Sequence, residues 1–224
     1  MSLISSTDFT GIEVIGFDLD QTLYPKSPKI DEAIQGYIYE KIAQHKGCDL
    51  AAARKLFTDL YQGGKGLSGS QTLTSLGIPN PKEVVQEALE NADIAEFLLP
   101  NGEVIELLNK LKQKYKHVDL ITGSIRPIAE KKLKKLNISL SLFDQVITGE
   151  VGKSDGSAYR AWLKCYPDFK PEQFLYIGDR EKSDYWVPKE LMIQCLLVNI
   201  SIPNPEVHCL QLSNLLSLKK YLIS

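Results

Sequence analysis

No apolar run in the sequence reaches the roughly 18 residues that a bilayer-spanning segment needs. The opening residues, MSLISSTDFTGIEV, also lack the basic cluster and the apolar core of a secretory signal peptide. Positive charge is not in excess, because the formal net charge is −2. We therefore expect a cytoplasmic protein with no membrane and no nucleic acid polymer among its partners, in which local groups bind any anionic ligand.

Cysteine is scarce, with four residues in 224: Cys48, Cys165, Cys195 and Cys209. They form no CxxC pair and no metal-ligand spacing, so we expect reduced, incidental thiols rather than disulfides or a zinc site. The histidines share no motif and are not expected to be ligands; they are His45, His117 and His208.

The sequence also has no internal repeat and no low-complexity tract. With 43% hydrophobic and 24% charged residues, it is long enough for one large domain or for a core with a smaller partner. Fibrous, disordered and disulfide-scaffold classes do not fit this composition.

The first part of the chain reads as one strand followed by helices. An apolar strand, IEVIGFDL, precedes a helical stretch in which Ile30, Ile34, Ile38 and Ile42 repeat on one face. Further helices are predicted at residues 49–61, 70–77 and 81–91. Because no strand is expected between the first strand and Pro100, we interpret residues 25–98 as an inserted helical cap domain.

From Pro100 onward, short apolar strands alternate with helices. Strands are predicted at residues 117–122, 144–148, 174–178 and 195–199, and helices from Pro127, at 155–165 and at 183–191, before a final amphipathic segment at 210–222. This alternation is typical of a parallel sheet wrapped on both faces. We therefore expect an α/β fold with a doubly wound, mostly parallel sheet, whose core comprises residues 1–24 and 99–224.

Two stretches imitate binding motifs. In EKKLKKLN (130–137), Leu133 and Leu136 supply an inward stripe, so we expect the lysines to lie on a solvated face. In GEVGKS (149–154), only two residues separate Gly149 from the Gly-Lys pair, whereas a P-loop has four there. Neither a nucleic acid site nor a P-loop is expected.

Acidic and polar residues follow the ends of the predicted strands. Asp18 and Asp20 follow the first strand, Thr122, Gly123 and Ser124 the second, Thr148, Gly149 and Lys153 the third, and Asp179 and Asp184 the fourth. Ligands of an open parallel sheet bind outside the carboxyl ends of its strands. These residues are therefore expected to converge at one edge of the sheet.

The residue types at this edge suit Mg²⁺ and phosphate. Clustered carboxylates repel one another unless a hard cation is bound, and Mg²⁺ prefers carboxylate, carbonyl and water oxygens. The Thr122 hydroxyl, the Gly123 amide and the Lys153 ammonium would supply donors for phosphoryl oxygens. Asp18 and Asp20 lie two positions apart, so on an extended strand they point the same way about 7 Å apart. One carboxylate can then act at phosphorus and the other at the leaving oxygen.

Four separated motifs resemble those of the haloacid dehalogenase-like superfamily. FDLDQTLYP resembles its first motif, DxDxT, and LITGS resembles its second; Lys153 fits the third, and YIGDREKSD fits the fourth, GDxxxxD. The resemblance covers nearly the whole chain in the right order, and a helical insert after the first motif matches members with a cap there. YQGGKGLSG and FLLPNGEVIELLNKLK are also similar to capped pyrimidine 5′-nucleotidases of this superfamily.

The resemblance implies an aspartyl-phosphate mechanism. Asp18 would be the nucleophile, while Asp20 would protonate the leaving oxygen and then activate the hydrolytic water. An acid at Asp20 favours a phosphate monoester over a haloacid, because an alkoxide needs a proton and a halide does not.

The resemblance also implies a metal site and a phosphoryl site. Mg²⁺ would be held by Asp18, the backbone carbonyl of Asp20 and Asp179, with Asp184 supporting the metal through water or orienting Lys153. The phosphoryl-binding residues would be Thr122, Gly123 and Lys153, and Thr22 would stabilise the turn.

Two departures from the family pattern and one loop leave alternatives open. Gln21 stands where many relatives carry Gly or Asn, which affects the turn but removes no catalytic group. The third motif lacks the common Lys-Pro pair, so Lys164 is the alternative to Lys153. We interpret the glycine-rich stretch at residues 63–70 as a lid loop, and its contact with the substrate is left open.

The leading hypothesis is a Mg²⁺-dependent phosphomonoesterase acting on a small phosphorylated metabolite, with a nucleoside monophosphate as the first candidate substrate. A sugar phosphate, a phosphoglycolate-like substrate and a phosphomutase reaction remain open, because the same four motifs serve all three. Outside enzymes, the alternatives are an idle phosphate-binding protein and a receiver-type signalling module. A receiver needs neither the acid at Asp20 nor the helical insert. The oligomeric state is not indicated.

Overall fold

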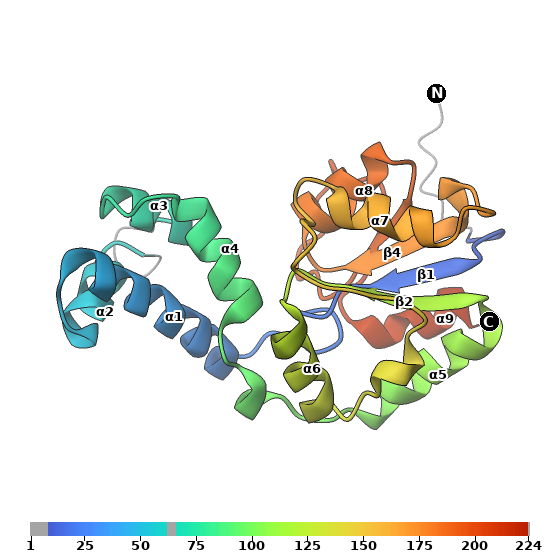
Figure 1. Ribbon diagram of the computed structural model, residues 1–224, viewed down its shortest axis with the longest axis horizontal. Helices are drawn as coiled ribbons and strands as arrows, with labels where there is room; N and C mark the ends of the chain where they lie inside the picture. Colours follow the sequence, from blue (N-terminus) through green and yellow to red (C-terminus); the bar gives the residue numbers. More distant parts are fainter. Residues whose placement is uncertain (1–8, 62–65, 224) are drawn as a thin grey trace. The chain divides into compact units, whose positions relative to one another are not determined.

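A computed structural model of the chain describes residues 9–61 and 66–223. The chain divides into two compact units, Met1–Pro25 with Leu98–Ser224 and Lys26–Phe97. The first unit carries the sheet, and the second is helical (Figure 1). None of the helices in the described ranges has both the length and the apolar character that a bilayer crossing requires.

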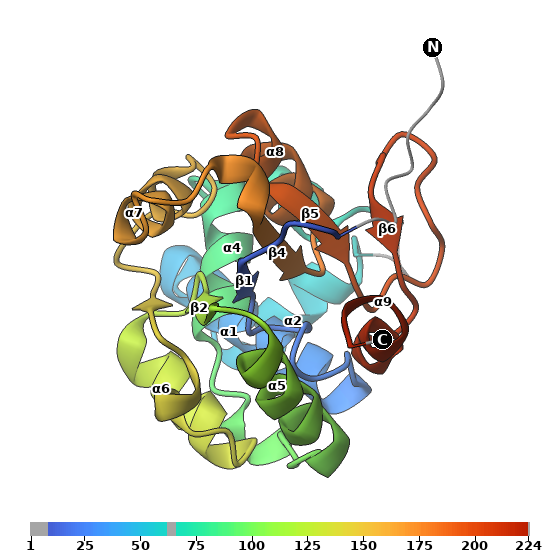
Figure 2. The same cartoon turned by 90° about the vertical axis from the view of Figure 1, so that its right-hand side faces the viewer.

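The sheet of the first unit has six strands in the part of the chain described. They are β1 (Val14–Phe17), β2 (His117–Ile121), β3 (Val146–Ile147), β4 (Phe174–Gly178), β5 (Gln194–Leu197) and β6 (Leu210–Gln211). Their order is β3-β2-β1-β4-β5-β6, and every neighbouring pair is parallel. The strand β1 is buried throughout, as expected for the central strand of a sheet covered on both faces. Figure 2 shows β6 beyond β5 at the edge of the sheet.

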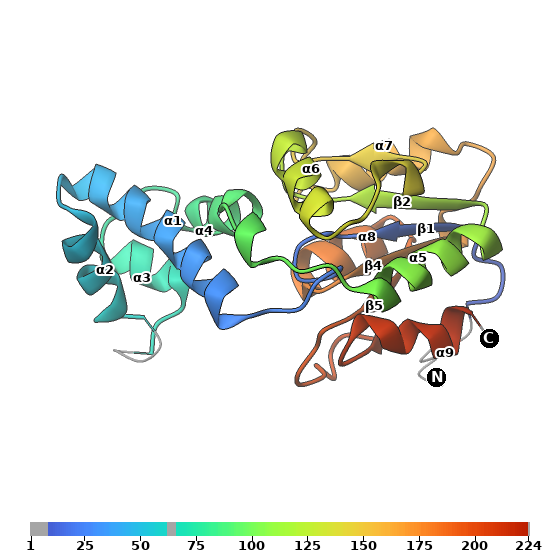
Figure 3. The same cartoon turned by 90° about the horizontal axis from the view of Figure 1, so that it is seen from below.

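Helices cover both faces of this sheet. They are α5 (Gly102–Lys114), α6 (Arg126–Lys135), α7 (Ser157–Cys165), α8 (Val187–Glu190) and α9 (Lys219–Leu222). In Figure 1, α7 and α8 lie above the sheet, and α5, α6 and α9 lie below it. Figure 3 shows α5 beside α9, where the Tyr115 hydroxyl donates a hydrogen bond to the Leu222 carbonyl at 3.2 Å. The strand order reverses direction beside β1, which creates the switch point of a doubly wound fold.

A buried carboxylate fixes α7 against the sheet. Asp119, in the middle of β2, is fully buried and accepts hydrogen bonds from Trp162 Nε1 at 2.7 Å and from the Tyr166 hydroxyl at 2.9 Å. The backbone N–H of Gln145 donates to the same side chain at 2.8 Å. Burial raises the pKa of Asp119, although these three donors oppose the rise. Trp162 also packs edge-on against Phe174 of β4, so α7 covers the centre of the sheet.

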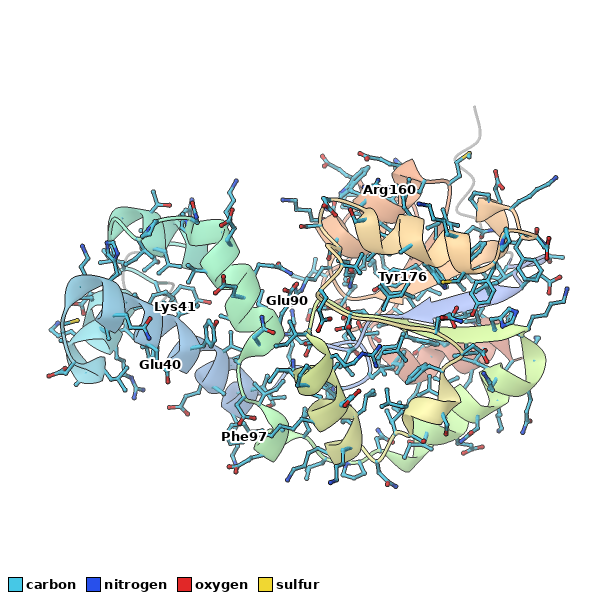
Figure 4. The ribbon with its side chains drawn as sticks, viewed as in Figure 1. Glu40, Lys41, Glu90, Phe97, Arg160 and Tyr176 are labelled. Carbon is cyan, nitrogen blue, oxygen red and sulfur yellow. The ribbon has the colours of Figure 1, made fainter. Side chains whose placement is uncertain are left out.

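The second unit is built from four helices, α1 (Pro28–Lys46), α2 (Leu50–Thr58), α3 (Gly69–Ser75) and α4 (Pro81–Asn91), and a short turn, η1 (Ala95–Phe97), within the described ranges. The Ser27 side chain caps α1 by accepting from the Ile30 N–H at 3.3 Å, with proline in the first turn. Phe57 of α2 is fully buried and meets the ring of Tyr39 edge-on at 5.5 Å. Figure 4 shows Lys41 on α1, whose Nζ lies 3.0 Å from Glu87 Oε2 of α4.

The predicted fold class is confirmed, and one local expectation is wrong. The final segment, 210–222, contains β6, which pairs with β5, a short turn, η5 (Leu215–Leu218), and α9. The helix expected at 183–191 is present as a π-helical turn, Lys182–Trp186, followed by α8. The lysines of 130–137 do not all face solvent, because Lys132 is 1% exposed.

Candidate active site

Asp18 stands at the carboxyl end of the central strand. Its backbone N–H donates to the Ile177 carbonyl of β4 at 2.8 Å, so the main chain is held between β2 and β4 at the switch point. The residue is 5% exposed. A ligand that reaches this edge of the sheet therefore meets Asp18 in a dry environment.

Lys153 joins two of the predicted aspartates. Its Nζ lies 2.5 Å from Asp18 Oδ1 and 2.9 Å from Asp184 Oδ1, and all three side chains are buried. The ammonium also lies 5.2 Å from the ring centre of Tyr176, which Figure 4 shows between α7 and the sheet. Lys164 is exposed on α7. Of the two lysines considered for the third motif, only Lys153 therefore lies beside the aspartates.

Asp184 is fixed by the end of β4 as well as by Lys153. Its Oδ2 accepts the backbone N–H groups of Asp179 at 3.0 Å and Arg180 at 2.9 Å, and its Oδ1 accepts the Ser183 hydroxyl at 2.8 Å. A Cβ on Gly178 would clash with this carboxylate, so the close approach needs glycine. Asp184 thus orients Lys153 and shapes the turn that carries Asp179.

Asp20 occupies a separate part of the site. Its Oδ1 accepts the Tyr24 hydroxyl at 2.5 Å and Lys132 Nζ at 2.7 Å, and its Oδ2 accepts the Ser124 hydroxyl at 2.7 Å. The contacts of Tyr24 and Lys132 were missed from the sequence. Lys132 carried one signal, because the buried residues Ala129 and Leu136 lie three and four positions from it and so share its helical face.

Thr122 and Gly123 lie where β2 ends. The Thr122 hydroxyl oxygen accepts the Ser124 backbone N–H at 3.1 Å, which leaves its hydrogen to donate to a ligand. The Gly149 N–H donates to the Ser124 carbonyl at 2.9 Å, and a Cβ on Gly149 would clash with the carbonyl of Gly123. The loops after β2 and β3 can therefore approach closely only with glycine at 149.

The turn after Asp20 shows why Gly or Asn suits the position that Gln21 occupies. Gln21 has φ of 58°, in the left-handed region that Gly and Asn adopt most readily. Its carbonyl accepts Nδ2 of Asn199 at 2.6 Å, which ties the turn to the end of β5. Thr22, predicted to stabilise this turn, donates its hydroxyl to Asp18 Oδ2 at 3.4 Å.

Three carboxylates form a set that fits one small cation. One oxygen from each of Asp18, Asp179 and Asp184 lies within 4.8 Å of the others, and all three residues are buried. Hard oxygen donors at this spacing are the ligands that Mg²⁺ prefers. The carboxylate of Asp20 is not in this set, so the prediction for Asp20 concerns its backbone carbonyl and stays a prediction.

The electrostatics of these groups are set by burial and by one another. Burial raises the pKa of Asp18 to about 6; Lys153 opposes this rise, while the carboxylates of Asp184 and Asp20 add to it. Burial also disfavours the charged form of Asp184, but Lys153 and Arg180 outweigh it and hold the pKa of that carboxyl below its usual value. Burial would lower the pKa of Lys153, yet the two carboxylates raise it. Lys153 is thus a permanent cation here.

Two other predictions concern the loop 63–70 and the cysteines. Residues 62–65 lie outside the described ranges, so most of the loop 63–70 and its substrate contact stay a prediction. The four cysteines are free thiols. Burial raises the pKa of Cys209 to about 12, so this thiol is protonated near neutral pH.

A doubly wound parallel sheet with acidic residues at its switch point is a Rossmann-like α/β fold. The family model described as haloacid dehalogenase-like hydrolase matches residues 12–190. The chain therefore belongs to the haloacid dehalogenase-like hydrolase family.

Named relatives agree with this assignment. A glyceraldehyde 3-phosphate phosphatase from Methanopyrus kandleri is 26% identical over 183 residues, which cover 77% of this chain and 78% of that protein. An HAD phosphatase from Thermococcus onnurineus has a TM-score of 0.62 at 20% identity, covering 93% of this chain and 97% of that one. A putative beta-phosphoglucomutase from Thermotoga maritima has a TM-score of 0.59 at 22% identity, covering 93% and 99%. The two structures agree in fold, and the family with the named phosphatase supports the expected enzyme class, a phosphatase.

Proposed function

We propose that this chain is a Mg²⁺-dependent phosphatase that hydrolyses a small phosphorylated metabolite through an aspartyl-phosphate on Asp18. The observation that carries the proposal is the placement of Lys153, whose ammonium contacts both Asp18 and Asp184 at the edge where Asp179 also lies. This arrangement supports a nucleophilic carboxylate whose charge is offset by a fixed cation.

The chain's own residues can divide the reaction between them. In the first step, a carboxylate oxygen of Asp18 bonds to phosphorus while the bond from phosphorus to the leaving oxygen breaks, and Asp20 gives its proton to that oxygen. In the second step, Asp20 takes a proton from water, the water oxygen bonds to phosphorus, and the bond to Asp18 breaks. The products are an alcohol and inorganic phosphate, and Asp20 ends protonated as it began.

The metal ligands in this proposal are the carboxylates of Asp18 and Asp179, with the carbonyl of Asp20, and Asp184 orients Lys153. A bound Mg²⁺ would supply charge neutralisation for the phosphoryl group. Thr122, Gly123 and Lys153 would bind the phosphoryl oxygens, because a hydroxyl, an amide and an ammonium are donors suited to them.

For the substrate, we place a phosphorylated sugar or triose before a nucleoside monophosphate. This order rests on the curated relative, a glyceraldehyde 3-phosphate phosphatase at 26% identity. The similarity to pyrimidine 5′-nucleotidases rests on short stretches, part of which lies in the undescribed residues 62–65. We also propose that Lys26–Phe97 acts as a cap that selects the leaving group.

The test of this function is hydrolysis of an aryl phosphate by the wild type and by Asp18→Asn, with Mg²⁺ and after chelation. We expect turnover only in the wild type with Mg²⁺. Turnover that survives Asp18→Asn or chelation would contradict the mechanism. A panel containing glyceraldehyde 3-phosphate, hexose phosphates and nucleoside monophosphates then ranks the substrates, and a preference for nucleotides would reverse the proposed order.

A further inference from the structure

Lys132 connects both oxygens of Asp20. Its Nζ donates to Asp20 Oδ1 at 2.7 Å and to Ser124 Oγ at 2.9 Å. An ammonium can only donate, so the Ser124 hydroxyl accepts from Lys132, and it donates to Asp20 Oδ2, 2.7 Å away. One buried cation therefore fixes Oδ1 directly and Oδ2 through a serine.

The two oxygens of Asp20 are not equally occupied. Oδ1 accepts from both Tyr24 and Lys132, which fills the two positions that a carboxylate oxygen offers. Among the described residues, Oδ2 accepts only from Ser124. The second position of Oδ2 is thus the one left for a proton exchanged with a ligand or with water.

Stability alone does not account for Lys132. Its side chain is 1% exposed and that of Asp20 is 5% exposed, so both charges are removed from water. A buried ion pair often contributes no more net stability than apolar residues of the same size. Lys132 stands in a helical stripe that is otherwise apolar, with Ala129 and Leu133 as neighbours, where a leucine or methionine would fit the pattern.

We propose that Lys132 is a positioning residue that acts through Asp20: with Ser124 it fixes the carboxylate so that Oδ2 carries the transferred proton. The proposal rests on the proposed function, because it assigns the atom at which that function's acid and base act. Lys132 is not expected to touch the phosphoryl group, and its effect on the reaction passes through the direction in which Asp20 points.

The proposal predicts a particular kinetic pattern for Lys132→Met. The parameter kcat/KM reports the steps up to departure of the leaving group, and an aryl oxide departs without a proton whereas an alkoxide needs one. We expect kcat/KM to fall by about 10²-fold for alkyl phosphates and to stay nearly unchanged for aryl phosphates with acidic leaving groups. The kcat for aryl phosphates should still fall, because the second step needs Asp20 as a base.

The experiment measures kcat/KM across phosphate esters of increasing leaving-group pKa for the wild type, Lys132→Met, Ser124→Ala and the control Lys135→Met. Lys135 is exposed on the same helix, so its variant should follow the wild type. Ser124→Ala removes the hydrogen bond to Oδ2 without removing a charge, and it should show the same kinetic pattern. It therefore tests the proposal even if Lys132→Met does not fold. An equal loss for every ester, or no loss, would overturn the proposal.

A crystal structure of Lys132→Met gives a readout that does not need activity. We expect the Asp20 carboxylate to rotate or to occupy two conformers, whereas an unchanged carboxylate would overturn the positioning role. If the wild type hydrolysed no phosphate ester, the proposed function would fail, and this structural comparison would still decide whether Lys132 positions Asp20.

Discussion

The ammonium of Lys153 lies 2.5 Å from the Oδ1 atom of Asp18, although 135 positions separate the two residues in the chain. The carboxyl end of β1 brings Asp18 to the edge, and the loop before α7 brings Lys153. Because Lys153 also contacts Asp184, it neutralises charge that two buried carboxylates would otherwise carry unpaired.

Replacing Lys153 with methionine should therefore lower both the rate of phosphate ester hydrolysis and the free energy of unfolding. We expect loss of aryl phosphate hydrolysis by at least about 10²-fold. Removing one partner of a buried ion pair typically costs about 3–5 kcal/mol, so the free energy of unfolding of the metal-free protein should fall by about that amount. Urea unfolding and steady-state kinetics measure the two effects. Lys164→Met is the matched control, and the reverse outcome, an inactive Lys164 variant with an active Lys153 variant, would refute the assignment.

The raised pKa of Asp18 predicts how stability depends on pH. The folded metal-free protein holds the Asp18 proton more tightly than the unfolded chain, since its pKa is about 6 against an ordinary 3.8. The stability that this proton contributes is present at low pH and is lost as the pH rises through about 6. Asp18→Asn removes this contribution, so near neutral pH the variant should be more stable than the metal-free wild type, and the difference should shrink as the pH falls below about 6.

Chemical unfolding of wild type and Asp18→Asn across this pH range, with chelator present, measures the difference. Asp168→Asn, at an exposed position, serves as the control and should not change the pH trend. A difference between Asp18→Asn and the wild type that stays constant with pH would show that Asp18 is not the group responsible.

The metal site predicts a stabilising effect of Mg²⁺. Because Asp18, Asp179 and Asp184 offer oxygens within 4.8 Å of one another only in the folded chain, Mg²⁺ should raise the thermal midpoint of the wild type. Asp179→Asn should remove most of this rise, since it replaces one of the two carboxylate ligands of the proposed metal set with a neutral amide. Thermal unfolding with increasing Mg²⁺ tests this. The assignment of the metal site would be wrong if Mg²⁺ raised the thermal midpoints of Asp179→Asn and Asp168→Asn by the same amount.

The turn at Gln21 predicts an order of stability among substitutions. Its φ of 58° costs most for β-branched residues and least for Gly and Asn. We expect Gln21→Val to lower the free energy of unfolding by about 1–2 kcal/mol and Gln21→Asn to leave it unchanged or raised. Urea unfolding of the variants supplies the order. A Val variant as stable as the Asn variant would mean that the left-handed turn is not under strain.

Much of the architecture could be predicted because it depends on local patterns. The strand at 174–178 was placed at its observed bounds, since a fully buried parallel strand is a short apolar run between polar turns. The segment 210–222 could not be placed in the same way. Two residues, Leu210 and Gln211, form β6 only because β5 offers an unpaired edge, and no periodicity in the segment indicates that edge.

In the candidate site, too, the contacts that follow from strand ends could be predicted, and those set only by the fold could not. Strand ends predicted that Asp18, Asp179 and Asp184 would meet, and they lie together. Lys132 was assigned to the solvated face because Leu133 and Leu136 were taken to supply the inward stripe of its helix. Its partners, Asp20 and Ser124, are 112 and 8 positions away, and the longer of these separations is set only by the fold.

The central claim is that Asp18 carries the phosphoryl group, and trapping that group tests it most directly. Asp20→Asn keeps the nucleophile but lacks the base that activates water, so an aryl phosphate with a labelled phosphoryl group should leave label on the protein. We predict near-stoichiometric label, released by hydroxylamine as expected of an acyl phosphate and mapped to the peptide that contains Asp18, with none in the Asp18→Asn, Asp20→Asn double variant. Label on another residue, or label that persists in the double variant, would contradict the account.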